Sequence, residues 1–264
     1  MNIIQPSHQI MGIFPTDESC LKWLEAIGRT CYKSEDKITA ESAPKFVKGL
    51  LKLDRFNKLQ RTITEEVERY RRDVTTSTLS VELPQLTPEM LACKVMGAVH
   101  AMLEDPPHES VIEHSIITVR FIFDRGISHE ACRHRLASLT QESTRYVSYG
   151  KEGAINVIEP IAFPEDQDDE GRRTIWKRAM EFAQAMYMDL LDAGATPQNA
   201  RSVLPTGVKT EVVMSANFRE WRHIFRLRTS TKAHPQIREV MIPLLQELQA
   251  MPNLGLIFSD IRLP

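Results

Sequence analysis

The chain has 264 residues, of which 42% are hydrophobic and 26% are charged, and its formal net charge is -2. This length can bury an extensive core, in one large domain or two small ones. The slightly acidic balance excludes binding to nucleic acid or to an anionic membrane by bulk electrostatic attraction, so any contact with an anion has to come from local clusters of cations.

Cysteine usage and the N-terminal sequence indicate a protein of the cell interior. The four cysteines show neither a C-x-x-C pair nor the spacing of zinc ligands. The first residues lack a basic segment followed by a long apolar run, and no stretch approaches the ~18 apolar residues of a membrane span. We therefore expect a soluble, cytoplasmic protein with reduced thiols.

Helical spacing dominates the first part of the chain. Apolar residues at helical intervals predict a first helix over residues 19–30, and a second pattern runs from residue 43 to about 60 and on into charged sequence. We interpret residues 53–90 as a possible insertion. Helical spacing returns at residues 90–102 and ends before Pro106-Pro107.

A strand and a short helix are predicted in the middle of the chain. Residues 116–123 are mostly β-branched or aromatic, which is typical of a buried strand. A turn at residues 124–126 leads to Ser128, a residue type that favours a helix N-cap. We expect the cationic residues that follow to lie on this short helix.

The next segments alternate between extended and helical patterns. Residues 154–163 predict a strand or extended segment, and the acidic residues 164–171 predict a solvated loop. Residues 176–191 have the apolar period of a core helix that ends at Gly194. A short helix follows from Thr196-Pro197 to Leu204.

The last part predicts one strand and two helices. Residues 209–215 read as a strand that leads to Asn217, the expected N-cap of a helix. That helix has an apolar stripe of Phe218, Trp221, Ile224 and Phe225, and a cationic side made by Arg219, Arg222, His223 and Arg226. The final helix begins near Pro235, and Pro243 predicts a kink in it.

The stretch from Ser128 to Lys151 carries the densest set of polar donors in the sequence. These are Arg133, His134, Arg135, Ser138, Thr140, Gln141, Ser143, Thr144 and Arg145. Guanidinium forks and hydroxyl groups suit phosphate oxygens and carbonyls better than a metal ion, so this stretch predicts an anion site.

Two other interpretations remain open from the residues alone. Four histidines, His108, His114, His129 and His134, could hold the metal of a hydrolase, although the neighbouring arginines would repel a dication. Alternatively, residues 133–145 and 219–228 could be basic patches of a nucleic-acid-binding module. The acidic net charge and the scarcity of aromatic residues expected to be exposed in those patches count against this module.

The spacing Arg133-His134-Arg135, seven residues and then Ser143 resembles the signature of the flavin-dependent thymidylate synthases. Residues 108–114 and the Arg201 that stands before Leu-Pro match the same family, and the resemblance covers most of residues 20–250. It implies an α+β fold with a central, mostly antiparallel sheet flanked by helices. It also implies that residues 1–264 form a single domain, with about 53–90 as a family-variable insertion, and that the subunits assemble as a homotetramer with shared active sites.

The resemblance implies an enzyme, a methyltransferase of dTMP biosynthesis. The reaction is the reductive methylation of dUMP to dTMP, with methylenetetrahydrofolate as carbon donor, FAD as hydride carrier and NADPH as reductant. In this flavoprotein chemistry the cofactor carries the redox step, and the protein binds and aligns the reactants. No metal, nucleic acid or membrane partner is expected.

Site residues follow from the resemblance position by position. Those implied to hold FAD are His108, Ser110, Arg133, His134, Arg135, Gln141, Asn217, Arg219, His223 and His234. Those implied to surround dUMP are Glu130, Arg133, Gln141, Glu142, Ser143, Thr144, Arg145, Arg201 and Arg228. Three positions depart from some members of the family: Glu130 stands where others have Gln, Gln141 replaces a Glu, and His223 is often Asn.

Arg228 is implied to be catalytic, through its contact with the uracil ring. A fixed cation beside the ring amide favours loss of the ring proton, because an opposite charge stabilises an ionised group. The resulting enolate-like ring is a better carbon nucleophile.

Overall fold

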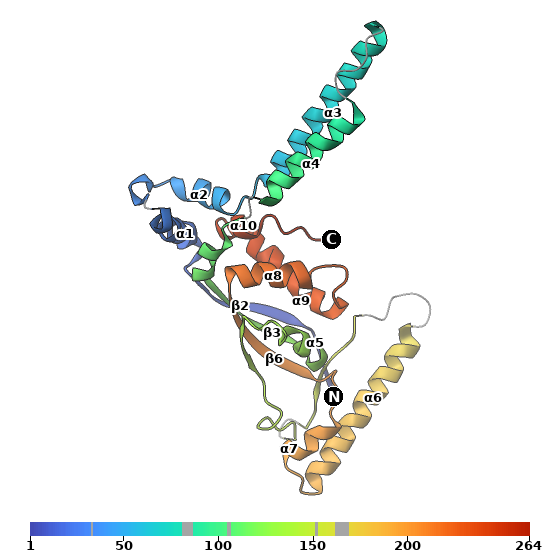
Figure 1. The fold of residues 1–264 in the computed structure, drawn as a ribbon. Helices are drawn as coiled ribbons and strands as arrows, with labels where there is room; N and C mark the ends of the chain where they lie inside the picture. Colours follow the sequence, from blue (N-terminus) through green and yellow to red (C-terminus); the bar gives the residue numbers. More distant parts are fainter. Residues whose placement is uncertain (33, 81–86, 105–106, 151–152, 162–168) are drawn as a thin grey trace. The chain divides into compact units, whose positions relative to one another are not determined.

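In a computed structural model, residues 1–32, 34–80, 87–104, 107–150, 153–161 and 169–264 are described (Figure 1). They fall into two compact units. The larger unit contains residues 1–20 and 112–264, and the smaller unit contains residues 21–111. The single-domain organisation expected from the sequence stays a prediction.

The larger unit is built on a four-stranded antiparallel sheet (Figure 1). The strands lie in the order β2 (Ser7–Phe14), β3 (Ile116–Asp124), β6 (Lys209–Asn217) and β4 (Ser138–Gln141). A separate parallel pair joins β1 (Asn2–Ile4) to β5 (Asn156–Ile158). The α+β class and the antiparallel central sheet are confirmed.

One face of the sheet is covered, as the alternation of buried and half-buried residues along the two central strands shows. Ile117, Val119 and Phe121 on β3 are fully buried, whereas the residues between them are half-buried. The covering helix presents Trp221, whose ring lies 6.3 Å from that of Phe121 and whose indole N–H donates to the Ile117 carbonyl at 3.0 Å. The two-residue period of a half-covered sheet therefore fixes the register of this core.

Helices and short turns connect the strands of the larger unit. They are α5 (Arg125–Ala131), α6 (Asp169–Asp192), α7 (Pro197–Ala200), the 3-10 turn η3 (Arg201–Val203), α8 (Phe218–Arg228), α9 (Pro235–Ala250) and α10 (Leu254–Phe258). The expected core role of α6 is confirmed, because Met180 and Tyr187 pack in a cluster with Tyr149 and Val157. Helix α9 continues past Pro243, and the kink there stays a prediction.

The smaller unit is helical. Its elements are α1 (Asp17–Tyr32, from Leu21 on), η1 (Glu35–Lys37), α2 (Ser42–Leu50), α3 (Arg55–Ser80), α4 (Pro88–Glu104) and the start of η2 (Glu109–His114). Helices α3 and α4 lie side by side as a hairpin, joined in one place by an ion pair of 3.0 Å between Lys94 and Glu66 (Figure 1). The insertion expected at residues 53–90 falls on this hairpin, and residues 81–86 lie outside the described part.

The single helical pattern expected over residues 43–60 is wrong, because two helices occupy it. Helix α2 ends at Leu50, and Lys52 adopts a left-handed conformation with φ 53°. The Lys52 and Leu53 amides then donate to the carbonyls of Gly49 and Lys48, both at 3.2 Å. This is the bonding of a Schellman C-cap, which the sequence hides because Lys stands where Gly is usual.

The expected cap and helix position of the signature are also corrected. Asp124, not Ser128, caps α5, and its carboxylate accepts the Ile127 amide at 2.8 Å. Ser128 lies inside the helix and donates to the Arg125 carbonyl. The helix therefore begins four residues earlier than expected. It ends at Ala131, and the cationic residues 133–135 lie in the turn after it.

Other expectations hold in part. The extended segment expected over residues 154–163 contains β5, although residues 162 and 163 are outside the described part. Most of the expected acidic loop is also outside it, and residues 169–171 begin α6. Strands β1, β2 and β4 were not expected. Among the described residues, no helix has both the length and the apolar character that a membrane crossing requires.

Candidate active site

Arg228, the predicted catalytic residue, is held by three hydrogen bonds at the C-terminal end of α8. It donates from Nη1 to the Glu130 carboxylate at 2.6 Å, from Nη2 to the Glu130 carbonyl at 3.0 Å, and from Nε to His134 Nε2 at 3.0 Å. Its side chain is 17% exposed. A guanidinium has five N–H groups, so two are left to face a ligand from a fixed position.

His134 lies in the centre of this cluster as a neutral imidazole. Burial, the Arg228 cation and His223 together lower the pKa of His134 to about 4. Its other ring nitrogen lies 3.5 Å from the carboxylate of Glu220, whose pKa is raised by burial. Because neutral His134 accepts from Arg228, it orients the guanidinium without adding a second positive charge.

The segment that carries Glu130 and His134 is fixed to the edge strand β4. Gln141 donates from its amide to the Ser128 hydroxyl at 2.9 Å and to Thr210 at 3.2 Å. Arg125 donates to the Glu142 carbonyl at 2.9 Å. Both amide hydrogens of Gln141 are thereby directed into the scaffold, which leaves its carbonyl oxygen as the group that could contact a ligand.

A second charged network lies beside the end of β4. Lys209 donates to Glu142 at 3.1 Å and to Glu211 at 2.6 Å. Burial alone would lower the pKa of Lys209, but the two carboxylates outweigh burial and raise that pKa. Glu142 also accepts the backbone amide of Glu211 at 3.2 Å, so this predicted substrate residue is engaged in holding the strands together.

The predicted dUMP residues after β4 are brought together with Arg201. The Arg201 guanidinium donates to the Thr144 hydroxyl at 3.3 Å, and Arg145 donates to Gln198 at 3.1 Å. Ser143 accepts the Arg145 amide at 3.3 Å, so the hydroxyl hydrogen of Ser143 remains available. Two guanidinium groups and two hydroxyls from segments far apart in sequence therefore form one donor patch.

The arginines of the turn after α5 have open surroundings. Arg133 and Arg135 are exposed, and neither guanidinium has a hydrogen bond or ion pair within the described parts of the chain. Arg219 differs, because it pairs with Glu113 at 2.5 Å. Phosphate oxygens could therefore approach Arg133 and Arg135 without displacing a protein carboxylate.

Two predicted flavin residues serve as helix caps. Asn217 accepts the Glu220 amide at 2.8 Å at the start of α8, as expected from the sequence. His234 accepts the Gln236 amide through Nδ1 at 3.3 Å at the start of α9. His223 is exposed, with its ring 6.2 Å from that of His134.

The remaining two predicted flavin residues, His108 and Ser110, belong to the smaller unit. The His108 amide donates to the Leu50 carbonyl at 2.9 Å. Its side chain lines a cavity of about 560 Å³ together with Arg29, Lys45, Phe46 and Lys52. Cations and an aromatic ring thus surround His108 within its own unit.

The histidines considered for a metal do not gather. Within the described residues, one set of three side chains could place ligand atoms within 4.8 Å of one another: His134, Glu220 and His223. His114 and His129 are not in it. Since Arg228 already donates to His134 Nε2, a dication at this set would face a fixed positive charge.

The sequence did not identify Glu220 and Lys209 as part of the site. Glu220 stands three residues after the cap Asn217, a spacing that signals a capping box. That pattern locates the helix start but does not reveal that the carboxylate faces His134. Lys209 carried no signal beyond its place at the start of a strand.

The four-stranded antiparallel sheet with its helices defines an α+β protein, and the guanidinium, imidazole and hydroxyl groups described above are its candidate anion-binding site. The family model described as thymidylate synthase complementing protein matches residues 18–252. The chain belongs to this family, and the resemblance found in the signature is confirmed.

Curated relatives agree with this assignment. The chain is 36% identical over 143 residues to a flavin-dependent thymidylate synthase of Pyrococcus furiosus, which covers 53% of the chain and 57% of the relative. It is 36% identical over 158 residues to the enzyme of the same name from Pyrococcus abyssi, covering 59% and 64%. The chain thus spans less than two thirds of the length of these two relatives.

Solved structures share the fold over nearly the whole chain. Thymidylate synthase X from Helicobacter pylori, solved with FAD and dUMP, is 17% identical with a TM-score of 0.60 over 97% of this chain and 98% of its own. A UMP/dUMP methylase from Streptomyces cacaoi, bound with 5-Br dUMP, is 20% identical with a TM-score of 0.61 over 98% and 96%. At these identities the likeness concerns the fold.

Proposed function

We propose that the protein catalyses the reductive methylation of dUMP to dTMP, with methylenetetrahydrofolate as carbon donor, FAD as cofactor and NADPH as reductant. Family membership supports the proposal, as do the names of the relatives. The observation that carries it is the fixed Arg228, which lies with Glu130 and His134 as one cluster.

The donors of the larger unit fit a flavin nucleotide. Its diphosphate needs cations that are not already neutralised, and Arg133 and Arg135 meet that need within the described chain. The neutral imidazole of His134 and the exposed ring of His223 could contact a ring system without repelling it. When bound, FAD would supply hydride transfer, which no side chain can provide.

Arg228 is proposed to polarise the pyrimidine. Its two remaining N–H groups can donate to a ring carbonyl, and its charge favours loss of the proton from the adjacent ring amide. Because the guanidinium is already held by Glu130 and His134, little reorganisation accompanies the reaction.

The nucleotide phosphate is proposed to bind at the donor patch of Ser143, Thr144, Arg145 and Arg201. Arg201 and Thr144 are already in contact, and bidentate guanidinium contacts suit a phosphate. We further propose a homotetramer with shared sites, as membership of the family implies.

Absorbance of the purified protein tests the proposal. We expect oxidised-flavin bands that change on titration with dUMP, and formation of dTMP when methylenetetrahydrofolate and NADPH are both present. A colourless protein whose activity is lost with chelators would favour a metal hydrolase instead. Salt-sensitive binding of nucleic acid without flavin would favour the basic-patch module.

A further inference from the structure

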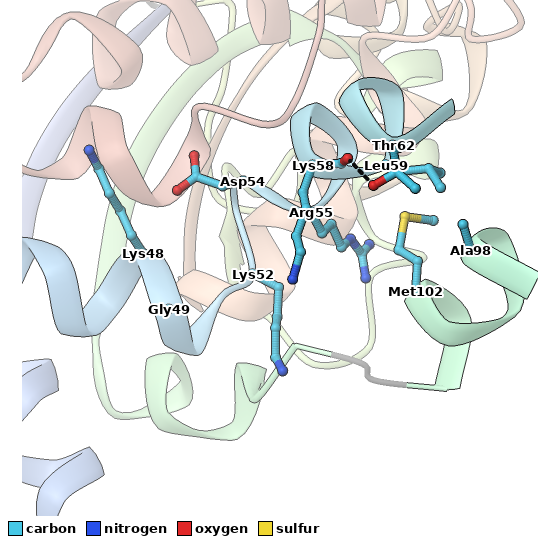
Figure 2. Close-up of a pocket in the computed structure, with 10 residues that line it drawn as sticks. All are labelled: Lys48, Gly49, Lys52, Asp54, Arg55, Lys58, Leu59, Thr62, Ala98 and Met102. Carbon is cyan, nitrogen blue, oxygen red and sulfur yellow. Dashed lines mark hydrogen bonds between the residues drawn. The ribbon is translucent and has the colours of Figure 1, made fainter. Parts of the chain in front are cut away.

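A second cavity in the smaller unit contains none of the predicted catalytic or flavin residues. It has a volume of about 430 Å³ and lies between the end of α2 and the base of the α3–α4 hairpin. Figure 2 shows the ten residues that line it: Lys48, Gly49, Lys52, Asp54, Arg55, Lys58, Leu59, Thr62, Ala98 and Met102.

The lining of this cavity is strongly cationic. Four of its side chains are Lys or Arg and one is a carboxylate, Asp54. Lys48 and Lys58 have no ion pair within the described residues. Because like charges that line one cavity repel one another, a ligand with more than one negative charge would relieve the repulsion.

The backbone holds one of these cations at a cost. Lys52 closes the Schellman cap of α2 with φ 53°, a conformation that Gly adopts without strain. Glycine at this position would be the more stable choice for the fold alone. A strained residue that carries a charge into a cavity indicates a use for that charge.

One wall of the cavity is apolar. Leu59 on α3 and Ala98 and Met102 on α4 form it, and all three are partly exposed (Figure 2). An inorganic anion would leave this wall in water, whereas a ligand with a flat or aliphatic body would cover it. The flexible thioether of Met102 can adapt to such a body.

We propose that this cavity binds an organic phosphate of nucleotide size, with its phosphates among Lys48, Lys52, Arg55 and Lys58 and its apolar body against Leu59 and Met102. The volume lies in the range of ~300–1,000 Å³ that is usual for small-molecule sites. Lysine ammonium groups serve as point-charge donors to phosphate. The site does not depend on the catalytic assignment.

The cavity overlaps in part with the one that contains His108. Gly49 and Lys52 line both, but the other cations and the apolar wall belong to the hairpin cavity alone. Since most of its lining is not shared, we expect the hairpin site to bind its ligand also when FAD and dUMP are present.

Calorimetric titration of the full-length protein with ATP tests the proposal, in the presence of saturating FAD and dUMP so that other nucleotide sites are filled. We expect saturable binding with one site per chain that weakens as salt is raised. The Lys48→Ala/Lys58→Ala variant should weaken it about tenfold, because it removes two exposed charge contacts. Met102→Glu, which adds a carboxylate to the wall, should abolish it.

Lys22→Ala is the matched control, since it removes an exposed cation of the same unit outside the cavity. It should leave ATP binding unchanged. Inorganic tripolyphosphate and pentaglutamate distinguish the ligand chemistry. Tripolyphosphate binding as tightly as ATP would show that the apolar wall is not used, and tighter binding of pentaglutamate would show that carboxylates are preferred. Either result, or no saturable binding, would overturn the proposal.

Discussion

The larger and the smaller unit handle charge in different ways. In the larger unit the arginines of α8 that matter most are enclosed and paired, as Arg222 is by Asp260 and Arg228 by Glu130. In the smaller unit the lysines around the hairpin cavity stand at a surface, and two of them have no ion pair within the described residues. A buried, paired cation is held in a fixed position, which suits the stabilisation of charge in a reaction. An exposed cation can move and attracts an anion more weakly, because salt screens it.

The strongest test of this contrast is Arg222, because its charge is almost completely enclosed. The sequence assigned Arg222 to a cationic, exposed side of α8, and this was wrong. Its side chain is 1% exposed and bonds Asp260 in a bidentate manner at 2.7 and 2.8 Å. Arg222→Ala should lower the free energy of unfolding by about 3–5 kcal/mol, measured by urea denaturation, since it leaves a half-enclosed carboxylate without this partner.

Arg226→Ala is the control for this measurement. Arg226 contacts the same Asp260 at 3.3 Å, but its side chain is 44% exposed. We expect a loss of less than about 1 kcal/mol. Equal losses in the free energy of unfolding of the Arg222 and Arg226 variants would mean that burial does not decide how much these ion pairs stabilise the fold.

Arg228→Ala tests the same contrast in activity. Loss of a fixed donor to a developing negative charge should lower kcat by about 100- to 1,000-fold, while FAD remains bound. The measurement is dTMP formation at saturating dUMP, together with the flavin spectrum of the variant.

Glu130→Gln removes the negative charge beside Arg228 but keeps a hydrogen-bond acceptor there. Gln can still accept the Arg228 hydrogen bond but no longer neutralises the guanidinium. We expect turnover at least as high as in the wild type. Full turnover in Arg228→Ala would show instead that Arg228 has no part in the reaction.

Local patterns predicted the parts of the fold that local interactions decide. The strand at β3, the cap at Asn217 and the apolar stripe of α8 are confirmed, because each has a signal within a few neighbouring residues. Strands β1, β2 and β4 were missed. All three partner strands in their ladders are far away in sequence, and three of the four residues of β4 are polar, which resembles a loop.

The sequence could predict which residues belong to the site, but not which of them contact one another. The signature named Arg133, His134 and Ser143, but no pattern in one segment shows that His134 meets Arg228, 94 residues away. The burial of Arg222 was missed for the same reason, since its partner Asp260 lies 38 residues further on. Contacts between distant segments depend on tertiary packing, which periodicity does not encode.

His134 predicts a pH dependence of stability. Its pKa in the folded protein is about 4, below the ordinary value near 6.5, so folding favours the neutral ring. The stabilising contribution is therefore complete above pH ~6.5 and is lost as the pH falls toward ~4, by up to about 3 kcal/mol. Denaturation of the wild type and of His134→Gln at several pH values measures it.

The difference in stability between the wild type and His134→Gln at each pH gives the contribution of the His134 titration. Glu220 beside it has a pKa raised by burial, so its protonation as the pH falls offsets part of the loss in both proteins. Gln can still accept from Arg228 but does not titrate. Parallel stability curves for the two proteins would contradict an enclosed, neutral His134.

The smallest expected effect compares two helix ends of identical bonding, one in each unit. Helix α6 ends with Gly194 at φ 86°, whose amide donates to Leu191 while Ala195 donates to Leu190, as Lys52 and Leu53 do at the end of α2. Lys52→Gly should raise the free energy of unfolding by about 1 kcal/mol. Gly194→Ala should lower it by a similar amount. A Cβ at position 194 meets nothing within 4 Å, so this loss comes from the backbone conformation alone. Opposite signs in denaturant melts would show that the smaller unit gives up stability to keep a charge at its cavity. A loss in Lys52→Gly would mean instead that the lysine side chain stabilises the fold itself.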